Sequence, residues 1–250
     1  MGNMSIKKTY KDWSESAERL VLYADIMGFK NRVLTTEHEE LRKSLQIFRE
    51  DFTKQASPLQ IEDYLRFVQF SDSILAVAQS ADKKMLNLIT KFGVRLMQIS
   101  SEMGFPIKGV LSKGMFTFDT ENQLYFGQPL VDAYLLHEEI KFYGIVVHHT
   151  AENLVKQFGG NAYCNNQIFI AKGKVNHYHL RWNMFKKTLD EGDNTTDCIM
   201  WLDKIAETVS GEPRMYIDHT KEILVCDKNT QKPKAKKLEV KSTKKNIKKH

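Results

Sequence analysis

The chain has few of the residues and segments that would assign it to several classes of protein. Its 250 residues include only three cysteines, Cys164, Cys198 and Cys226, which are odd in number and widely spaced. This spacing fits neither a disulfide framework nor a Cys-x-x-Cys metal site, so we expect reduced cysteines that serve packing. No run approaches the roughly 18 apolar residues that span a bilayer, and the polar N-terminus lacks a secretory hydrophobic region. We therefore expect a cytoplasmic protein without a membrane segment.

Net charge is also scarce over most of the chain. The formal net charge is +6, but the stretch from Gln231 to His250 alone carries +8, from nine Lys and one Glu, which leaves −2 for residues 1–230. A lysine-rich terminus without aromatic residues cannot bury enough apolar area to fold, so we expect a disordered tail over 231–250. Such a tail could attract nucleic acid or anionic lipid. A solvated end explains the charge more simply, and we expect no specific nucleic-acid partner.

Apolar residues, by contrast, are plentiful. They make up 42% of the 250 residues, which suits one large domain or one domain with an extension. Two histidine pairs, His148-His149 and His177-x-His179, could be proposed as zinc ligands. No carboxylate or thiol stands at a supporting spacing, so we favour strand or loop histidines without a metal.

The residue pattern predicts an α+β fold. Strands are expected at 20–25, 106–118, 124–127 and 144–149, a hairpin at 63–79, and helices at 36–54, 83–103 and 130–140. A capping box, Thr36-x-x-Glu39, opens the first helix, and Gly104 closes the second. The order β, α, β, β, α, β is that of a ferredoxin-like split β-α-β sheet, which we expect to be mixed but mainly antiparallel.

The signals weaken after residue 173. We expect a helix at 196–209 and a hairpin at 215–225. The chain is accordingly divided into a domain over 1–173, an extension over 174–230 packed on it, and the tail over 231–250.

Two aspartates stand at the edges of apolar segments. Asp25 ends the run Val21-Leu22-Tyr23-Ala24, and Asp72 lies at the tip of the expected hairpin. Strand interiors disfavour Asp, so each carboxylate needs hydration, hydrogen bonds or a cation. In a split β-α-β sheet the first strand and the hairpin are neighbours, so both side chains can converge on Mg²⁺ or Mn²⁺. Taken alone, each aspartate could also be a strand-end cap or an ordinary turn residue.

The residues after Asp25 suit an anion. Ile26-Met27-Gly28-Phe29 is a turn in which glycine permits close backbone approach and free amides can face a phosphate. A carboxylate beside such amides suits a metal-bound triphosphate.

Four motifs in order resemble those of class III nucleotidyl cyclases. They are Asp25-x-x-Gly28-Phe29, Ser71-Asp72 between two strands, Gly109 to Gly114, and Tyr125-Phe126-Gly127-x-x-Leu130-Val131-Asp132-Ala133-Tyr134. The closer resemblance is to the bacterial pyrimidine branch, the Pycsar cyclases of antiphage defence. It covers residues 20–149 and implies that the domain over 1–173 is a cyclase catalytic domain.

The resemblance also implies a reaction. The ribose 3′-hydroxyl of a nucleoside triphosphate attacks the α-phosphate, and pyrophosphate departs. Asp25 and Asp72 would hold two ions, Mn²⁺ or Mg²⁺, and the Ile26 carbonyl would add a ligand. Phosphate oxygens would be received by the amides of Met27, Gly28 and Phe29.

The chain departs from the purine cyclases at four positions. Val68 and Leu124 stand where those enzymes select the base with polar side chains, and neither can hydrogen-bond a purine edge. Val131 and Leu135 stand where they place an Asn and an Arg that orient the ribose and stabilise the transition state. The first difference favours a pyrimidine, and the second removes the usual catalytic arginine.

Another cation can replace that arginine, or the chain is a poor catalyst. The candidates are Lys30, Arg32, Arg66, Lys108 and Lys113. We favour Arg66 because it lies on the strand that leads to Asp72, although a surface cation would explain it equally well. Tyr64, two residues earlier and expected on the same face, could stack on a pyrimidine or pack in the core.

Class III sites form between two cyclase domains, so the resemblance implies a homodimer with sites at its interface. The hypothesis is a cyclase that converts UTP or CTP to the 3′,5′-cyclic monophosphate, with a small preference for UTP, and signals to a separate effector protein. The alternatives are an inactive cyclase-like module that senses nucleotides, and a purine nucleotide cyclase.

Overall fold

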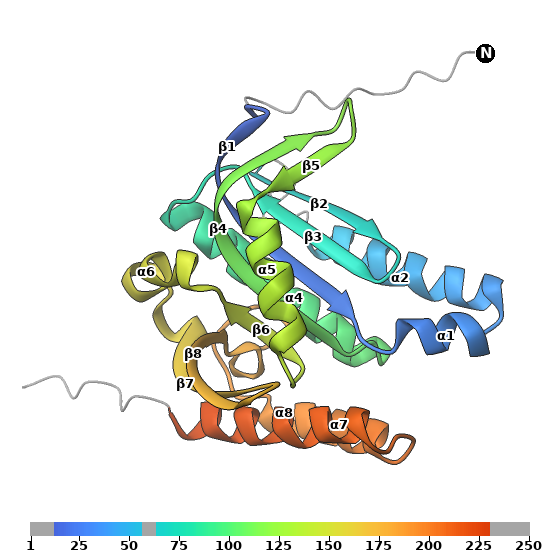
Figure 1. The fold of residues 1–250 in the computed structure, drawn as a ribbon. Helices are drawn as coiled ribbons and strands as arrows, with labels where there is room; N and C mark the ends of the chain where they lie inside the picture. Colours follow the sequence, from blue (N-terminus) through green and yellow to red (C-terminus); the bar gives the residue numbers. More distant parts are fainter. Residues whose placement is uncertain (1–12, 57–63, 231–250) are drawn as a thin grey trace, which may run out of the picture.

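The strands form one mixed sheet (Figure 1). In a computed structural model, which describes residues 13–56 and 64–230, they are β1 (Ser16–Ile26), β2 (Leu65–Phe70), β3 (Ser73–Ala78), β4 (Ile107–Asp119), β5 (Leu124–Gly127), β6 (Gly144–Val147), β7 (Tyr163–Ile170) and β8 (Gly173–Leu180). Their order across the sheet is β2-β3-β1-β4-β6-β8-β7, and β5 pairs with β4. β4 and β6 run parallel, whereas the other neighbours run antiparallel. The predicted mixed, mainly antiparallel sheet is confirmed.

The first four strands have the ferredoxin-like arrangement. β1 lies between β3 and β4, with Asp25 opposite Ser73 on one side and Lys108 on the other. Every residue from Leu20 to Ala24 is buried, because helices cover both faces of the sheet at this strand. A run that is apolar at every position is what a strand buried on both faces requires.

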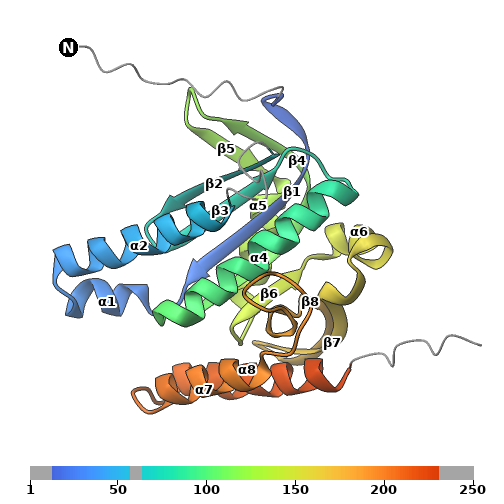
Figure 2. The same ribbon diagram turned by 180° about the vertical axis from the view of Figure 1, so that it is seen from behind.

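Helices cover the two faces unequally. They are α1 (Phe29–Thr35), α2 (His38–Ala56), α4 (Lys83–Met103), α5 (Gln128–Glu139), α6 (His149–Phe158), α7 (Thr195–Ala206) and α8 (Glu212–Asn229). α2 and α4 lie against one face of the sheet, and α5 lies across the other (Figures 1 and 2). The two faces of β1 show the same division, because Leu22 packs in the core cluster that contains Phe92 of α4, whereas Tyr23 packs with Ala133 of α5.

The ends of α4 agree with the predicted boundaries. Asp82 caps its first turn by accepting a hydrogen bond from the Met85 amide at 2.9 Å. Gly104 ends it with φ 70, a left-handed conformation that glycine adopts without strain.

The C-terminal part of the chain extends the sheet. β7 and β8 form a hairpin whose turn includes residues 171–172, and β8 pairs with β6. The boundary expected between residues 173 and 174 therefore falls in this hairpin, at the start of β8. α7 and α8 lie side by side at the end of the molecule that carries β7 and β8 (Figures 1 and 2).

The hairpin predicted at 215–225 is wrong, because these residues belong to α8. Pro213 stands in its first turn, where proline is tolerated. Its buried positions recur with helical spacing at Tyr216, Ile217, Thr220, Ile223, Leu224 and Asp227. The β-branched residues in this stretch suggested strands, but the 3.6-residue period of burial decides the structure.

The structure also adds two helices, α1 and α6, where none was predicted, and starts β1 at Ser16 rather than Leu20. The lysine-rich stretch over 231–250 lies outside the described residues. Within the described part of the chain, none of the helices combines the length and apolar character needed to cross a membrane.

Candidate active site

The end of β1 and the tip of the β2–β3 hairpin meet at one place. Ser71 and Asp72 form the two-residue turn, in which Ser71 has φ 57, as a tight hairpin turn requires. The amide of Ile26 donates to the Asp72 carbonyl oxygen at 3.0 Å, so the turn is bonded directly to the residue after Asp25. The expected neighbourhood of Asp25 and Asp72 is thus present in the backbone.

The surroundings of Asp25 make its charge costly. Its carboxylate accepts a hydrogen bond from Ser73 Oγ at 3.2 Å, and that hydroxyl lies 3.1 Å from Tyr23 Oη. Burial, followed by repulsion from the Asp72 carboxylate, raises the pKa of Asp25 to about 6. Two repelling carboxylates at the end of a buried strand fit divalent cations with oxygen ligands, because a cation would relieve both effects.

Lys108 is the cation that the fold places beside Asp25. It stands opposite Asp25 on β4, and its side chain is 5% exposed. Burial lowers the pKa of its ammonium group, while the carboxylates of Glu138 and Asp25 oppose this shift. Lys108 therefore adds positive charge to the site from within the core.

Arg66 lies farther along the sheet. Its guanidinium lies 4.3 Å from the centre of the Trp13 ring and 5.7 Å from that of Phe118. Arg66 pairs with Val77 on β3, and Val77 pairs with Val21 on β1. Val21 stands four residues before Asp25, so Arg66 is displaced from Asp25 by about 13 Å along the strand direction. Within one chain, Lys108 is thus better placed near Asp25 than Arg66.

Two of the other candidate cations make separate contacts. Arg32 donates to the Gly104 carbonyl oxygen and lies over the Phe105 ring, and Lys113 forms an ion pair with Glu18 at 3.2 Å.

Tyr64 and Arg66 were expected on the same face of the sheet, but they lie on opposite sides. Tyr64 precedes β2 and packs against the core cluster on the α4 side, with Lys84 Nζ 3.4 Å from its ring centre. Arg66 contacts rings of the cluster that contains Val21 and Phe118, on the opposite side. The expectation failed because the chain is helical at Tyr64, so the alternation of a strand does not yet apply.

Val68 and Leu124 are differently exposed. Val68 pairs with Leu75, which pairs with Tyr23, and it packs in the cluster on the Asp25 side of the sheet. Leu124 begins β5 and is 51% exposed, away from Asp25 of its own chain.

The turn after β1 supplies fewer free amides than predicted. The Met27 amide donates to the Pro106 carbonyl oxygen at 2.7 Å, so it is engaged within the fold and the prediction for Met27 is corrected. Gly28 has φ 75, and Phe29 starts α1. The first amides of a helix have no intrahelical acceptor, so the Gly28 and Phe29 amides stay candidates for contact with a phosphate.

A cleft of about 1450 Å³ opens behind this turn. It lies between α1, the end of α4 and helices α7 and α8, and its lining includes Gly28, Trp201 and Tyr216. Asp25 and Asp72 do not line it, so it is separate from the carboxylate pair.

A second cluster of potential ligands lies on the C-terminal elements. Cys164, His179 and Asp227 converge there, although the sequence predicted a packing cysteine and a histidine without ligand partners. Their positions, 15 and 48 residues apart along the chain, follow no local motif. Only the pairing of β7 with β8, and the packing of α8 beside them, brings the three together.

Comparisons with known proteins support the fold. No protein-family model and no curated protein matches the chain. Among solved structures, the adenylyl cyclase CyaB from P. aeruginosa matches with a TM-score of 0.51 and 17% identity, over 66% of this chain and 94% of that one. The guanylate cyclase domain of RhGC from Catenaria anguillulae, solved with GTP, matches with a TM-score of 0.52 and 14% identity, over 67% and 98%.

A dimeric guanylyl cyclase domain of RhoGC from Blastocladiella emersonii matches equally well, with a TM-score of 0.52 and 15% identity, over 67% of this chain and 98% of that one. Identities this low show a common fold. The chain has the fold of the class III adenylyl and guanylyl cyclase catalytic domains.

Proposed function

We propose that the protein is a pyrimidine nucleotidyl cyclase that converts UTP or CTP to the 3′,5′-cyclic monophosphate and pyrophosphate. One observation carries the proposal: Asp25 and the Asp72 turn are joined at the end of β1 in a cyclase fold. Burial, followed by repulsion from the Asp72 carboxylate, raises the pKa of Asp25 there. Such a pair is suited to binding cations together with the phosphates of a substrate.

The proposed roles of the residues follow from their positions. Asp25, Asp72 and the Ile26 carbonyl would hold two Mn²⁺ or Mg²⁺ ions, which when bound would supply Lewis-acid stabilisation of the phosphates. The Gly28 and Phe29 amides would orient phosphate oxygens, and the charge of Lys108 would favour the developing negative charge nearby. The 3′-oxygen forms a bond to the α-phosphorus as its proton leaves, and the bond from that phosphorus to pyrophosphate breaks.

The preference for a pyrimidine rests on two apolar side chains. Val68 and Leu124 offer no hydrogen bond to a purine edge, and the resemblance places both at the base. The neighbouring solved structures are adenylyl and guanylyl cyclases, so a purine substrate is the alternative that the test must include.

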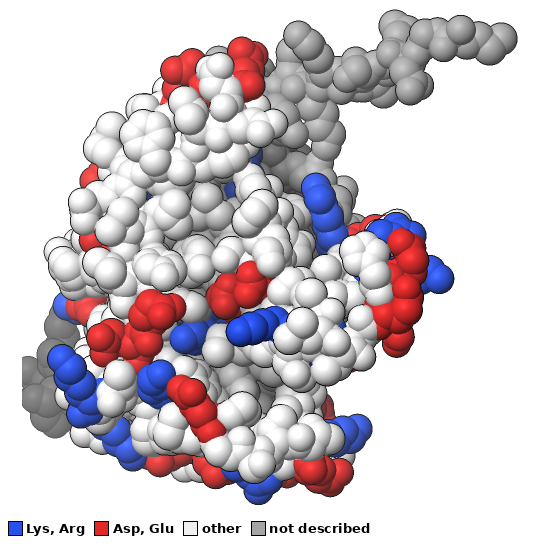
Figure 3. All heavy atoms as spheres, turned by 45° about the vertical axis from the view of Figure 1, so that its right-hand side comes forward, with Lys and Arg blue, Asp and Glu red and all other residues white. Residues whose placement is uncertain are grey.

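A homodimer is the proposed active form. Apolar side chains that are between 49% and 81% exposed lie on four elements: Phe70 on β2 at the hairpin tip, Met115 on β4, Leu124 and Phe126 on β5, and Val131, Tyr134 and Leu135 on α5. Figure 3 shows a broad area without charged side chains in the upper part of the molecule. A second copy would cover this surface and bring Leu124 of one chain toward the carboxylates of the other.

The proposed biological role follows from the resemblance. The cyclic nucleotide would activate a separate effector protein in antiphage defence.

An inactive nucleotide-sensing module is favoured by a different observation. Val131 and Leu135, in place of the usual Asn and Arg, are 52% and 61% exposed on α5 and carry no polar group. Such a module would bind a triphosphate without turning it over.

The test is to incubate the full chain with each of UTP, CTP, ATP and GTP in Mn²⁺ and to separate the products. Cyclic UMP or CMP as the main product is expected. Cyclic AMP or cyclic GMP alone would make it a purine cyclase, and nucleotide binding without product over long incubation would make it a sensing module. Sedimentation at the assay concentration is expected to show a dimer.

A further inference from the structure

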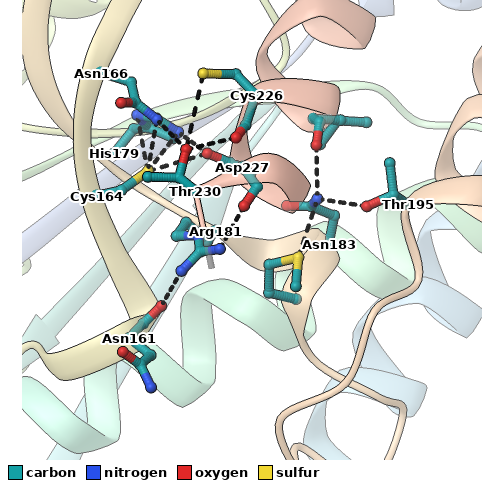
Figure 4. A network of polar contacts seen from close by, with 12 residues as sticks. Asn161, Cys164, Asn166, His179, Arg181, Asn183, Thr195, Cys226, Asp227 and Thr230 are labelled. Carbon is teal, nitrogen blue, oxygen red and sulfur yellow. Dashed lines mark hydrogen bonds and ion pairs between the residues drawn. The ribbon is translucent and has the colours of Figure 1, made fainter. Parts of the chain in front are cut away.

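Three potential metal ligands of different chemistry meet beneath α8. Figure 4 shows Cys164 from β7, His179 from β8 and Asp227 from α8 pointing toward one another. Cys164 Sγ lies 3.3 Å from His179 Nε2 and 3.0 Å from Asp227 Oδ1, and His179 Nε2 lies 2.8 Å from the same oxygen. A thiol, an imidazole nitrogen and a carboxylate oxygen thus face one point.

The cluster is buried, and one oxygen of its carboxylate is left without a hydrogen bond. His179 and Asp227 are each 1% exposed, and Cys164 is partly buried. Both neighbours contact Asp227 Oδ1, while Oδ2 has no hydrogen-bond partner among the described residues. A buried carboxylate oxygen without a partner is unfavourable, so a further group that binds this carboxylate would stabilise the site.

The nearest arginine does not neutralise the carboxylate. Arg181 donates from Nη2 to the backbone carbonyl oxygen of Asp227 at 2.5 Å and from Nη1 to that of Asn161 at 3.3 Å. Both bonds go to main-chain oxygens and leave the carboxylate oxygens of Asp227 to other partners.

The spacing of the three atoms fits a tetrahedral ion after a small expansion. Ligands of a tetrahedral Zn²⁺ lie about 3.4–3.6 Å from one another, given the usual Zn–S, Zn–N and Zn–O bond lengths. The three atoms here lie 2.8, 3.0 and 3.3 Å apart, as expected when hydrogen bonds hold the ligands together. Movements of a few tenths of an ångström would open the site, and three ligands from three elements leave a fourth position to water.

We propose that Cys164, His179 and Asp227 form a binding site for a divalent transition-metal ion of the Zn²⁺ class, separate from the proposed catalytic ions. On binding, the Cys164 thiol loses its proton to solvent and its sulfur bonds the ion, while His179 Nε2 and an Asp227 oxygen supply the other two bonds. Thiolate and imidazole select such an ion over Mg²⁺ and Mn²⁺. The ion would tie α8 to β7 and β8.

Co²⁺ is the probe that tests the site, because a thiolate–Co²⁺ bond gives a near-ultraviolet charge-transfer band. The full chain, treated with a chelator and exchanged into metal-free buffer, is titrated with Co²⁺. The expected result is a band that saturates at about one ion per chain and is bleached by Zn²⁺. Asp25 and Asp72 offer no sulfur, so Co²⁺ bound there gives no such band. Absence of the band from the wild-type protein would overturn the proposal.

Variants identify the sulfur. Cys164→Ser is expected to abolish the band, and Asp227→Asn to weaken Zn²⁺ affinity by more than the 10- to 100-fold typical for loss of an outer partner. The control is Cys198→Ala, which removes a thiol from α7 and should leave the band intact. An undiminished band in Cys164→Ser would refute the assignment, and circular dichroism checks that each variant is folded.

Discussion

The two clusters of ionisable side chains differ in composition, and the difference indicates which ion each would bind. At the end of β1, Asp25 and Asp72 provide oxygen atoms in a half-buried position beside a turn. Under α8, sulfur, nitrogen and oxygen converge, and His179 and Asp227 are almost completely buried. Oxygen ligands with open positions suit Mg²⁺ or Mn²⁺ and a phosphate substrate, whereas a buried set that includes sulfur and nitrogen suits an ion of the Zn²⁺ class. The proposed catalytic ions and the proposed stabilising ion would therefore bind at two different places in the chain.

The strongest test of this separation is to remove each cluster in turn. Asp25→Asn or Asp72→Asn is expected to lower kcat by about 100- to 1000-fold, because a charged group at the reacting phosphates is lost while its shape is kept. The Co²⁺ band should remain in both variants. Cys164→Ser should do the reverse, losing the band and retaining cyclisation.

Asp218→Asn is the matched control, since it removes an exposed aspartate of α8. If it lowered kcat as much as Asp72→Asn, the assignment of Asp72 to the site would fail.

Two buried histidines, one in the C-terminal cluster and one elsewhere in the core, differ in their surroundings. His179 is hydrogen-bonded to a carboxylate, whereas burial and the charge of Lys108 lower the pKa of His137 to about 4. The unfolded chain takes up this proton near pH 6.5, but the folded chain resists it, so the contribution of His137 to the unfolding free energy should fall between pH 6.5 and 4. Asp25, whose pKa in the folded chain is raised to about 6, contributes a change of opposite sign as the pH falls below 6. The loss from this group is about 3 kcal/mol over that range.

Urea unfolding of the wild type and of His137→Phe, which cannot be protonated, at a series of pH values isolates this loss. The unfolding free energy of the wild type relative to that of the variant should fall between pH 6.5 and 4. A difference that stays constant over this range would show that His137 does not cause the loss.

Zn²⁺ should stabilise the folded protein only when the C-terminal cluster of Cys164, His179 and Asp227 is intact. A free Zn²⁺ concentration of 100 times the dissociation constant raises the free energy of unfolding by about 2.7 kcal/mol. For a chain of this size, that raises Tm by roughly 5–10 °C. Differential scanning fluorimetry with Zn²⁺ should show this shift in the wild type and not in Cys164→Ser. A similar shift with Mn²⁺ in place of Zn²⁺ would contradict the proposed selectivity.

The smallest expected change distinguishes the cations around the first cluster. Lys108→Met should lower kcat about 10- to 100-fold, because Lys108 stands opposite Asp25, and Arg66→Met should lower it less. Steady-state kinetics with UTP and Mn²⁺ compare the two. A larger loss in Arg66→Met would instead place Arg66 at the site, reached across the dimer.

Sequence patterns predicted β1 to β6 and the first cluster because these depend on local signals, whereas β7 and β8 were not predicted. Asp25 at the end of an apolar run and Asp72 between two strands mark positions that a split β-α-β sheet brings together. The α4 helix was equally predictable, since Asp82 and Gly104 cap it within its own sequence.

What the sequence did not reveal depends on contacts between distant segments. The engagement of the Met27 amide requires Pro106, and the surroundings of Arg66 require Trp13 and Phe118. The ligand partners of His179 lie on β7 and α8, so no spacing rule could find them. Residues 215–225 form part of α8 and not the expected hairpin, because their buried positions follow a helical period.

The junction between β6 and β8 is narrow. The two strands are joined by a single residue pair, Val146 with His179, whereas β7 and β8 are paired along their whole length. The hairpin is also held at its far end, where the amides of Lys141 and Ala171 donate to the carbonyl oxygens of Phe169 and Glu139. An ion bound to His179 would sit at the one residue pair that joins the two strands, and would reinforce the sheet where its own pairing is shortest.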